Sequence, residues 1–159
     1  MAAEPSAPDR IPCMNLNVDA TGVYRFKVQG YSITRTMATK DATHYYQSEI
    51  FSVGSYSWAV RYYPYNGACS NVCVRLVLLG PRATGRVAVT FACTPLGKSG
   101  EPSVEMEKVS SEIIDTDDDS EPVDEVTWSW FHDDDLAKFV VGDSIVLQCA
   151  ISVLKWPKK

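Results

Sequence analysis

The sequence has no long apolar run, only two histidines and no closely paired cysteines. None of its hydrophobic stretches approaches the ~18 residues that a membrane-spanning helix needs, which argues against a transmembrane protein. The first fourteen residues lack a basic start followed by an apolar stretch, so they do not form a secretory signal. Neither His44 nor His132 lies near a nucleophile-elbow motif or a glycine-rich phosphate loop, so the sequence offers little support for an enzyme.

Cysteine usage points to a reducing compartment. The five cysteines are an odd number, and none forms a C-x-x-C pair; they are Cys13, Cys69, Cys73, Cys93 and Cys149. The last three lie within apolar alternation, where a free thiol behaves as a small core side chain. Cys69 and Cys73 have no histidine at a ligand-like spacing, which disfavours zinc. The sequence therefore predicts buried thiols, with no metal and no cofactor.

The formal net charge of −5 argues against a general nucleic-acid binder, but the charge is unevenly distributed. Residues 101–135 hold 14 acidic side chains against the single base Lys108. A block of this kind is usually a solvated, self-repelling loop and only sometimes a docking surface for a basic partner. The role of its central part, residues 112–125, stays open between these two interpretations.

The dominant period along the chain is two, which is typical of half-buried β-strands. Strands are expected at residues 23–28, 45–53, 57–63, 71–79, 86–94, 104–109, 126–131 and 144–153, with loops at 95–100 and 115–124. A helix of one or two turns is expected at residues 133–138, where three acids precede a helix-compatible stretch. Short strands without intervening helices predict one all-β domain, an antiparallel sandwich or barrel.

Aromatic residues are abundant for this length: eight Tyr, five Phe and four Trp. Several share short runs with a base, as Trp58 does with Arg61, and Trp128 and Trp130 form a cluster of their own. Alternation favours a core position for Trp58, Phe91 and Trp128. The functional alternative is a shallow groove on a sheet face that accepts an extended peptide, because aromatics and arginine are enriched where binding energy concentrates.

Two motifs carry a family resemblance. Residues 26–32 read FKVQGYS, and residues 48–64 read SEIFSVGSYSWAVRYYP. In combination and at this separation they resemble the MATH (meprin and TRAF homology) domain, most closely the version in plant proteins that join MATH to a BTB/POZ domain. The resemblance covers residues 20–154, which leaves residues 1–19 as a flexible N-terminal segment and residues 155–159 as a tail. It implies an eight-stranded antiparallel β-sandwich of TRAF/MATH type.

The resemblance also implies a function. MATH–BTB proteins are substrate adaptors of cullin-RING ubiquitin ligases, in which the MATH domain holds a Ser/Thr-rich, extended degron peptide and the BTB domain engages the cullin. Cullin contact would therefore run only through a BTB domain, which this chain does not contain. The expected location is the cytoplasm, the nucleus or both, with no nucleic-acid or membrane partner. Carried over by position, the groove residues are Arg61, Arg75, Phe91, Trp128 and Trp130.

Arg75 departs from the family pattern, because it stands where an aromatic residue is common; the anchor pocket of this chain should therefore be reshaped or more basic. Two other functions remain open under the same resemblance. One is a stand-alone structural or oligomerising TRAF-like domain, and the other is the MATH region of a deubiquitinating enzyme whose catalytic domain lies elsewhere.

Overall fold

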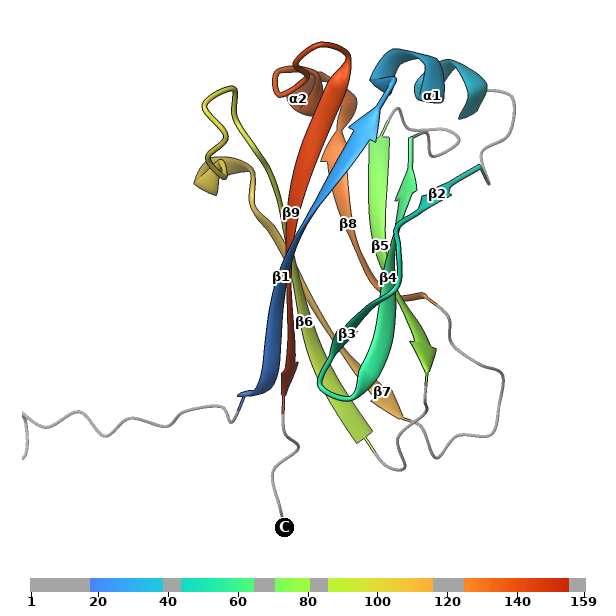
Figure 1. Ribbon diagram of the computed structural model, residues 1–159, viewed down its shortest axis with the longest axis vertical. Helices are drawn as coiled ribbons and strands as arrows, with labels where there is room; N and C mark the ends of the chain where they lie inside the picture. The colour runs from blue at the N-terminus through green and yellow to red at the C-terminus, as the bar shows by residue number, and fades with distance from the viewer. Residues whose placement is uncertain (1–17, 39–43, 65–70, 81–85, 116–124, 155–159) are drawn as a thin grey trace, which may run out of the picture.

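The computed structural model describes residues 18–38, 44–64, 71–80, 86–115 and 125–154. These residues form two antiparallel sheets packed face to face, with both helices at the same end of the sandwich (Figure 1). The first sheet has the strand order β1-β9-β6-β7, with β1 at Val18–Gln29, β9 at Ser144–Leu154, β6 at Arg86–Pro95 and β7 at Lys108–Asp115. The second has the order β2-β4-β5-β8, with β2 at Tyr46–Gln47, β4 at Tyr56–Tyr63, β5 at Asn71–Gly80 and β8 at Glu125–His132, and β3 (Phe51–Val53) pairs with β4.

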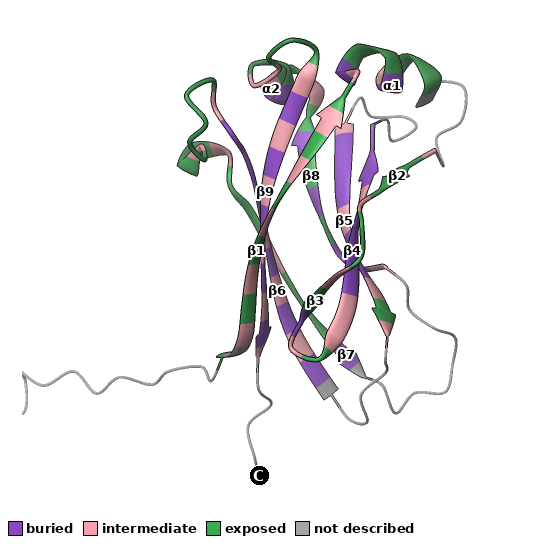
Figure 2. Ribbon diagram, viewed as in Figure 1, coloured by how far each residue is buried: buried purple, intermediate pink, exposed green. Residues whose placement is uncertain are grey.

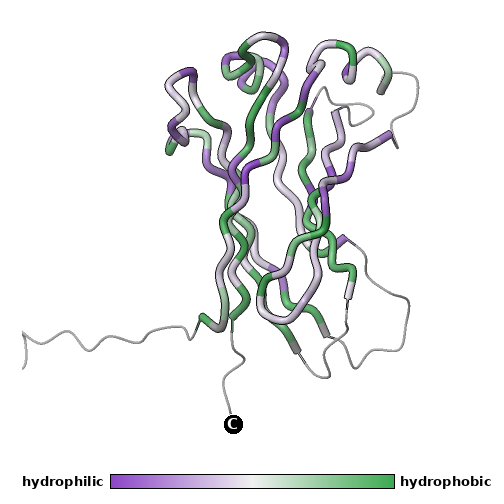
Figure 3. The backbone as a smooth tube through the Cα atoms, in the orientation of Figure 1, coloured by the Kyte–Doolittle hydropathy of each residue, from purple (hydrophilic) through white to green (hydrophobic). Residues whose placement is uncertain are grey.

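The core lies between the two sheets and is built from alternate residues of each strand. β9 alternates between buried and intermediate positions along its whole length, so one of its faces packs inward (Figure 2). The largest buried side chain is Trp58 of β4, and its indole N–H donates to the Val53 carbonyl at 3.0 Å. Hydrophobic residues run through the strands of both sheets (Figure 3). Burial of this apolar surface is the main stabilising contribution to the fold.

A tight hairpin joins β3 to β4. Its two loop residues, Gly54 and Ser55, have φ of 62° and 67°. Two consecutive positive φ angles characterise the two-residue turn whose twist matches that of antiparallel strands. This hairpin positions Trp58, because it brings the Val53 carbonyl within reach of the indole.

Most of the expected strands are confirmed, and the expected antiparallel sandwich is confirmed as the fold. The run expected at 45–53 is instead two short strands, β2 and β3, with a break at residues 48–50. The strand expected at 104–109 is wrong: residues Val104–Met106 form a 3₁₀ turn, and β7 begins only at Lys108. The loop expected at 115–124 and the two terminal segments fall almost wholly outside the described residues.

Helix α2 (Asp133–Ala137) confirms the short helix expected after β8, and α1 (Tyr31–Ala38) was not expected. The side chain of Asp133 joins the two, because it accepts from the Tyr31 hydroxyl at 2.9 Å and pairs with Arg35 at 3.1 Å. Burial, with this hydrogen bond second, raises the pKa of the Tyr31 phenol. Within the described residues, no helix is long and apolar enough to cross a membrane.

Three of the cysteines are buried free thiols, as expected: Cys73, Cys93 and Cys149. Cys93 and Cys149 face each other across β6 and β9, with their sulfur atoms 3.7 Å apart. Their mutual hydrogen bond and burial raise the pKa of Cys93. Cys13 and Cys69 lie outside the described residues.

Candidate functional site

The outer face of the β2-β4-β5-β8 sheet carries four of the five residues singled out from the sequence. Arg61 of β4 pairs with Arg75 of β5, and Arg75 pairs with Trp128 of β8, so the three lie in one row across three strands. Trp130 occupies the next row on the same face, opposite Cys73 and Tyr63. We call Arg61, Arg75, Trp128 and Trp130, together with Tyr45, Gln47, Tyr63 and Glu125, the outer-face site.

The two tryptophans are among the exposed side chains of this site. Trp128 is 48% and Trp130 37% exposed, whereas the intervening Ser129 points inward and is buried. β8 is an edge strand, because β5 is its only paired neighbour among the described strands. An edge strand presents backbone N–H and C=O groups that an extended segment can pair with. Two indoles at alternate positions of β8 therefore offer ring surfaces beside an edge that no other described strand pairs with.

Arg75 is held in place by its neighbours. Its guanidinium donates to both carboxylate oxygens of Glu125, at 2.8 and 2.9 Å, and lies 4.1 Å from the centre of the Tyr63 ring. The Tyr63 hydroxyl donates to the same carboxylate at 2.7 Å. Burial, followed by Glu125, raises the pKa of Tyr63 to about 12. The sequence predicts a more basic groove at Arg75, but Glu125 offsets much of that charge.

Arg61 is fixed in a similar way. Its Nε atom donates to the Gln47 side-chain oxygen at 2.9 Å, and its guanidinium lies 4.7 Å from the centre of the Tyr45 ring. The rings of Tyr45 and Tyr63 are 5.2 Å apart, which joins the two arginine environments. Rotamers restricted in this way lose less entropy when a partner binds.

Phe91 does not belong to this surface. It lies on β6 in the opposite sheet, is 0% exposed and packs in the core between the sheets. The physical reason is alternation: β6 turns Val89, Phe91 and Cys93 inward and leaves Ala88, Thr90 and Ala92 on the outer side. We therefore remove Phe91 from the candidate contact residues.

Sequence reasoning missed Tyr63 and Glu125. Tyr63 stands two positions after Arg61, and period-two alternation places both on one face, so this residue could have been found. Glu125 ends an acidic run that has no periodic pattern, and nothing local connects it with Arg75, 50 residues earlier.

The architecture defines the class first: a β-sandwich of TRAF/MATH type. Over 87% of this chain and 76% of the other, the structure superimposes on TRAF5 of Notothenia coriiceps with a TM-score of 0.59 and 15% sequence identity. A second comparison is by sequence. The chain is 44% identical over 43 residues to the Arabidopsis thaliana "BTB/POZ and MATH domain-containing protein 3", a match that covers 27% of this chain and 10% of that protein. No family model matches the chain.

These findings confirm the resemblance to the MATH domain, in the fold and in a stretch of sequence. The chain spans about a tenth of the length of the plant protein that it matches.

Proposed function

We propose that this chain is a non-catalytic peptide-binding module that holds an extended, Ser/Thr-rich degron segment along the free edge of β8. The observation that carries the proposal is the row formed by Arg61, Arg75 and Trp128, with Trp130 in the next row. In this mode backbone hydrogen bonds to the edge strand supply affinity, and ring surfaces beside it select alternate side chains.

The polar part of the site favours neutral hydroxyl groups over phosphate. A serine or threonine hydroxyl can accept from a guanidinium and can also donate to a carboxylate. A phosphate is attracted to Arg61 and Arg75, but it is repelled by Glu125, which already occupies Arg75 through two hydrogen bonds. We therefore expect unphosphorylated peptides to bind more tightly than phosphorylated ones. We expect the Glu125→Gln substitution to reduce this difference in affinity.

In the wider pathway, we propose that the module selects substrates for a cullin-RING ubiquitin ligase. The cullin would be reached through a BTB domain that lies outside these 159 residues. This role places the protein in the cytoplasm, the nucleus or both, with neither nucleic acid nor membrane as a partner. The partial likeness to a protein with BTB/POZ and MATH in its name supports this assignment.

A second candidate is an oligomerising domain, and one surface favours it. The outer face of the β1-β9-β6-β7 sheet presents Val23, Val109 and Ile113 at 57%, 63% and 52% exposure. Between them runs an uncharged row of Thr21, Ser152, Thr90 and Ser111. Such a row can pack on its own copy without like-charge repulsion. Light scattering distinguishes the two candidates. A stable oligomer that binds no peptide supports the oligomerising domain, and a monomer that binds peptide supports the peptide-binding module.

The test of strand addition uses two peptides of one sequence. The first is a fluorescent 12-residue peptide of alternating Ser/Thr and small apolar residues, and the second carries N-methyl groups at every other backbone nitrogen, on the edge meant to face β8. We expect the first to bind with micromolar-scale affinity and the second at least tenfold more weakly, because N-methylation removes backbone donors. Equal affinity of the two peptides, measured by anisotropy, would contradict pairing with β8.

A further inference from the structure

Two buried thiols lie in register on the two central strands of the first sheet. Cys93 of β6 is the direct partner of Cys149 of β9, and each of these strands has a paired neighbour on both sides. Both side chains belong to the core and are 0% exposed, and their sulfur atoms are 3.7 Å apart. The fold therefore brings into contact two nucleophilic groups that lie 56 positions apart in the sequence.

The hydrogen-bonding pattern of β6 and β9 determines which kind of pair the two cysteines form. Just beyond β6, the Leu96 N–H donates to the Val146 carbonyl at 2.9 Å, which makes these two residues a hydrogen-bonded pair of the ladder. Hydrogen-bonded and non-hydrogen-bonded pairs alternate along antiparallel strands, so Pro95 occupies a non-hydrogen-bonded pair, as its missing N–H requires. Two positions earlier, Cys93 and Cys149 occupy another non-hydrogen-bonded pair.

This kind of pair suits a disulfide bond between neighbouring strands. The Cα atoms of a non-hydrogen-bonded pair are ~4.5 Å apart, within the ~4.4–6.8 Å that disulfides span. The two sulfur atoms would have to approach by ~1.7 Å, from 3.7 Å to the bond length of ~2.05 Å. Rotation of the two side chains can supply a movement of this size, so the register of the strands need not change.

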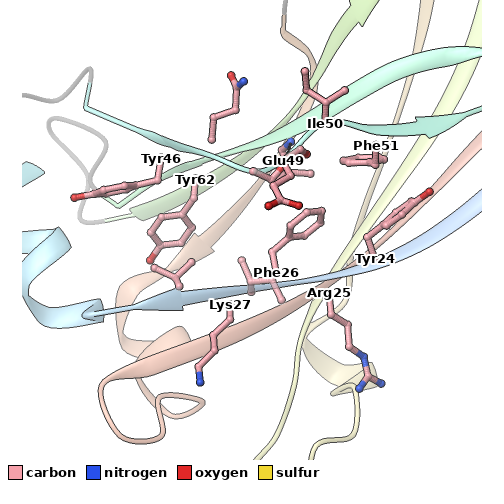
Figure 4. A pocket seen from close by; sticks show the side chains of 14 residues that line it. Tyr24, Arg25, Phe26, Lys27, Tyr46, Glu49, Ile50, Phe51 and Tyr62 are labelled. Atoms are coloured by element: carbon pink, nitrogen blue, oxygen red, sulfur yellow. Dashed lines mark hydrogen bonds between the residues drawn. The ribbon is translucent and has the colours of Figure 1, made fainter.

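Burial of the pair controls when such a bond can form or break. A hollow of about 630 Å³ lies on the side of the sandwich, where Figure 4 shows the rings of Phe26 and Phe51. Leu147 of β9 lines this hollow, but neither cysteine does. Thiol–disulfide exchange needs direct access to sulfur, so in the native state it requires that the sheet open. The thiols are most accessible while the chain folds.

We propose that Cys93 and Cys149 form a disulfide when the chain folds in the presence of a small disulfide oxidant, and that native burial then protects this bond from reduction. One cysteine thiolate attacks a sulfur of the oxidant and releases one thiol. The other thiolate attacks the cysteine sulfur of this mixed disulfide and releases a second thiol. The two cysteines lose two electrons and two protons, and the oxidant becomes two thiols. In a reducing compartment the pair stays as two free thiols, as in the structure.

The bond would join the ends of a segment that contains β7, β8 and α2. Closing a long loop restricts the unfolded chain more than the native one, which stabilises the fold. We therefore expect the disulfide to raise the melting temperature by roughly 10 °C. Because the cross-link lies between two central strands, it would also oppose opening of the first sheet.

The experiment starts from the full chain, unfolded in urea with all thiols reduced. One sample is refolded with reduced glutathione alone and the other with an excess of glutathione disulfide. Free thiols are then alkylated, and the linked peptides are identified by mass spectrometry without reduction. We expect the linkage between Cys93 and Cys149 to exceed every other cysteine–cysteine linkage by at least ~tenfold, because the native register favours this pair.

The matched variants are Cys93→Ala and Cys149→Ala, each of which removes the pair and keeps the other four cysteines. The oxidised and reduced forms of one variant are compared with each other, so the cost of the substitution itself cancels. We expect the wild type to melt at a higher temperature when oxidised, and we expect no such shift in either variant.

Protection from reduction is measured on the oxidised wild type with dithiothreitol. We expect the linkage to be lost at least ~tenfold more slowly under native conditions than in urea, because the native sheet excludes the reductant. The proposal is overturned if another linkage predominates, if the linked chain melts at or below the temperature of the reduced chain, or if dithiothreitol acts equally fast in both solutions. The wild-type measurements decide the question even where a variant fails to fold. None of these outcomes depends on peptide binding at β8.

Discussion

Replacing Trp128 with alanine probes the outer-face site most directly, because this indole is the largest exposed group beside the free edge of β8. Trp128 has 48% of its surface exposed. An aromatic side chain can bury up to ~250 Å², so roughly 120 Å² remains for a bound peptide to cover. At ~25 cal/mol per Å² this area corresponds to about 3 kcal/mol. Ordering and desolvation reduce the gain, and we expect a loss of ~2 kcal/mol, or about 30-fold in affinity.

The assay is a fluorescence-anisotropy titration of the Ser/Thr-rich peptide into the wild type, Trp128→Ala and a control variant. Val104→Ala is the matched control, because Val104 is 81% exposed on the 3₁₀ turn and lies outside the outer-face site. Circular dichroism and thermal melting establish that each variant is folded. If folded Trp128→Ala binds within twofold of the wild type, the tryptophan is not a peptide contact and the assignment of this face is refuted.

Three further predictions follow from the core and from buried ionisable groups. Phe91→Ala should lower the free energy of unfolding by ~3–5 kcal/mol in urea titrations, because it removes a fully buried ring. Phe91→Leu should retain peptide affinity. A folded Phe91→Leu variant that binds the peptide tenfold more weakly would return Phe91 to the candidate contact residues. The pKa of Tyr63 is raised from 10.0 to about 12, so the native state holds this proton more tightly than the unfolded state, and stability present below pH 10 should fall as the pH rises from about 10 to about 12. Tyr63→Phe should reduce this loss of stability above about pH 10, and a pH dependence of stability identical to that of the wild type would contradict the prediction. Cys93 and Cys149 should resist iodoacetamide at pH 8 in the native state and react after unfolding, because both are fully buried and the pKa of Cys93 is raised; native labelling of either peptide, detected by mass spectrometry, would show that the sheet interface opens readily.

Period-two patterning was sufficient to find most of the sandwich, because a strand with one buried face records that face in alternate residues. β9 is the clearest case, with burial alternating along its full length. The same pattern failed at residues 104–109. Val104 and Met106 alternate with Glu105 and Glu107, but Val104 is 81% exposed, and the N–H of Met106 donates to Ser103 in a 3₁₀ turn. Alternation predicts a strand only where a partner covers the apolar side.

Helix α1 could not be read from its own residues. Its sequence contains Ile33, Thr34 and Thr36, which are β-branched and have weak helix propensity. The helix is held from a distance: both carboxylate oxygens of Asp143, 111 residues away, accept from the backbone N–H and hydroxyl of Ser32. Contacts at such separation leave no local signal in the sequence.

The candidate site was predictable in part for related reasons. The resemblance supplied Arg61, Arg75, Trp128 and Trp130, and strand register brings them to one face. It also supplied Phe91, although the alternation of β6 already pointed that ring toward the core. Glu125 depends on a pairing between β5 and β8 that no sequence pattern specifies.

The contacts of Asp133 have a mechanical consequence for the sandwich. Tyr31 and Arg35 follow β1, whereas Asp133 follows β8, so their hydrogen bond and ion pair form a non-covalent cross-link between the two sheets. Because this link lies at the end that carries both helices, the sheets are clamped there, and separation should start from the opposite end (Figure 1). The outer-face site would then be more rigid at the end that carries the helices than at the opposite end. A strand bound along it would contact a rigid surface at one end and a more mobile surface at the other.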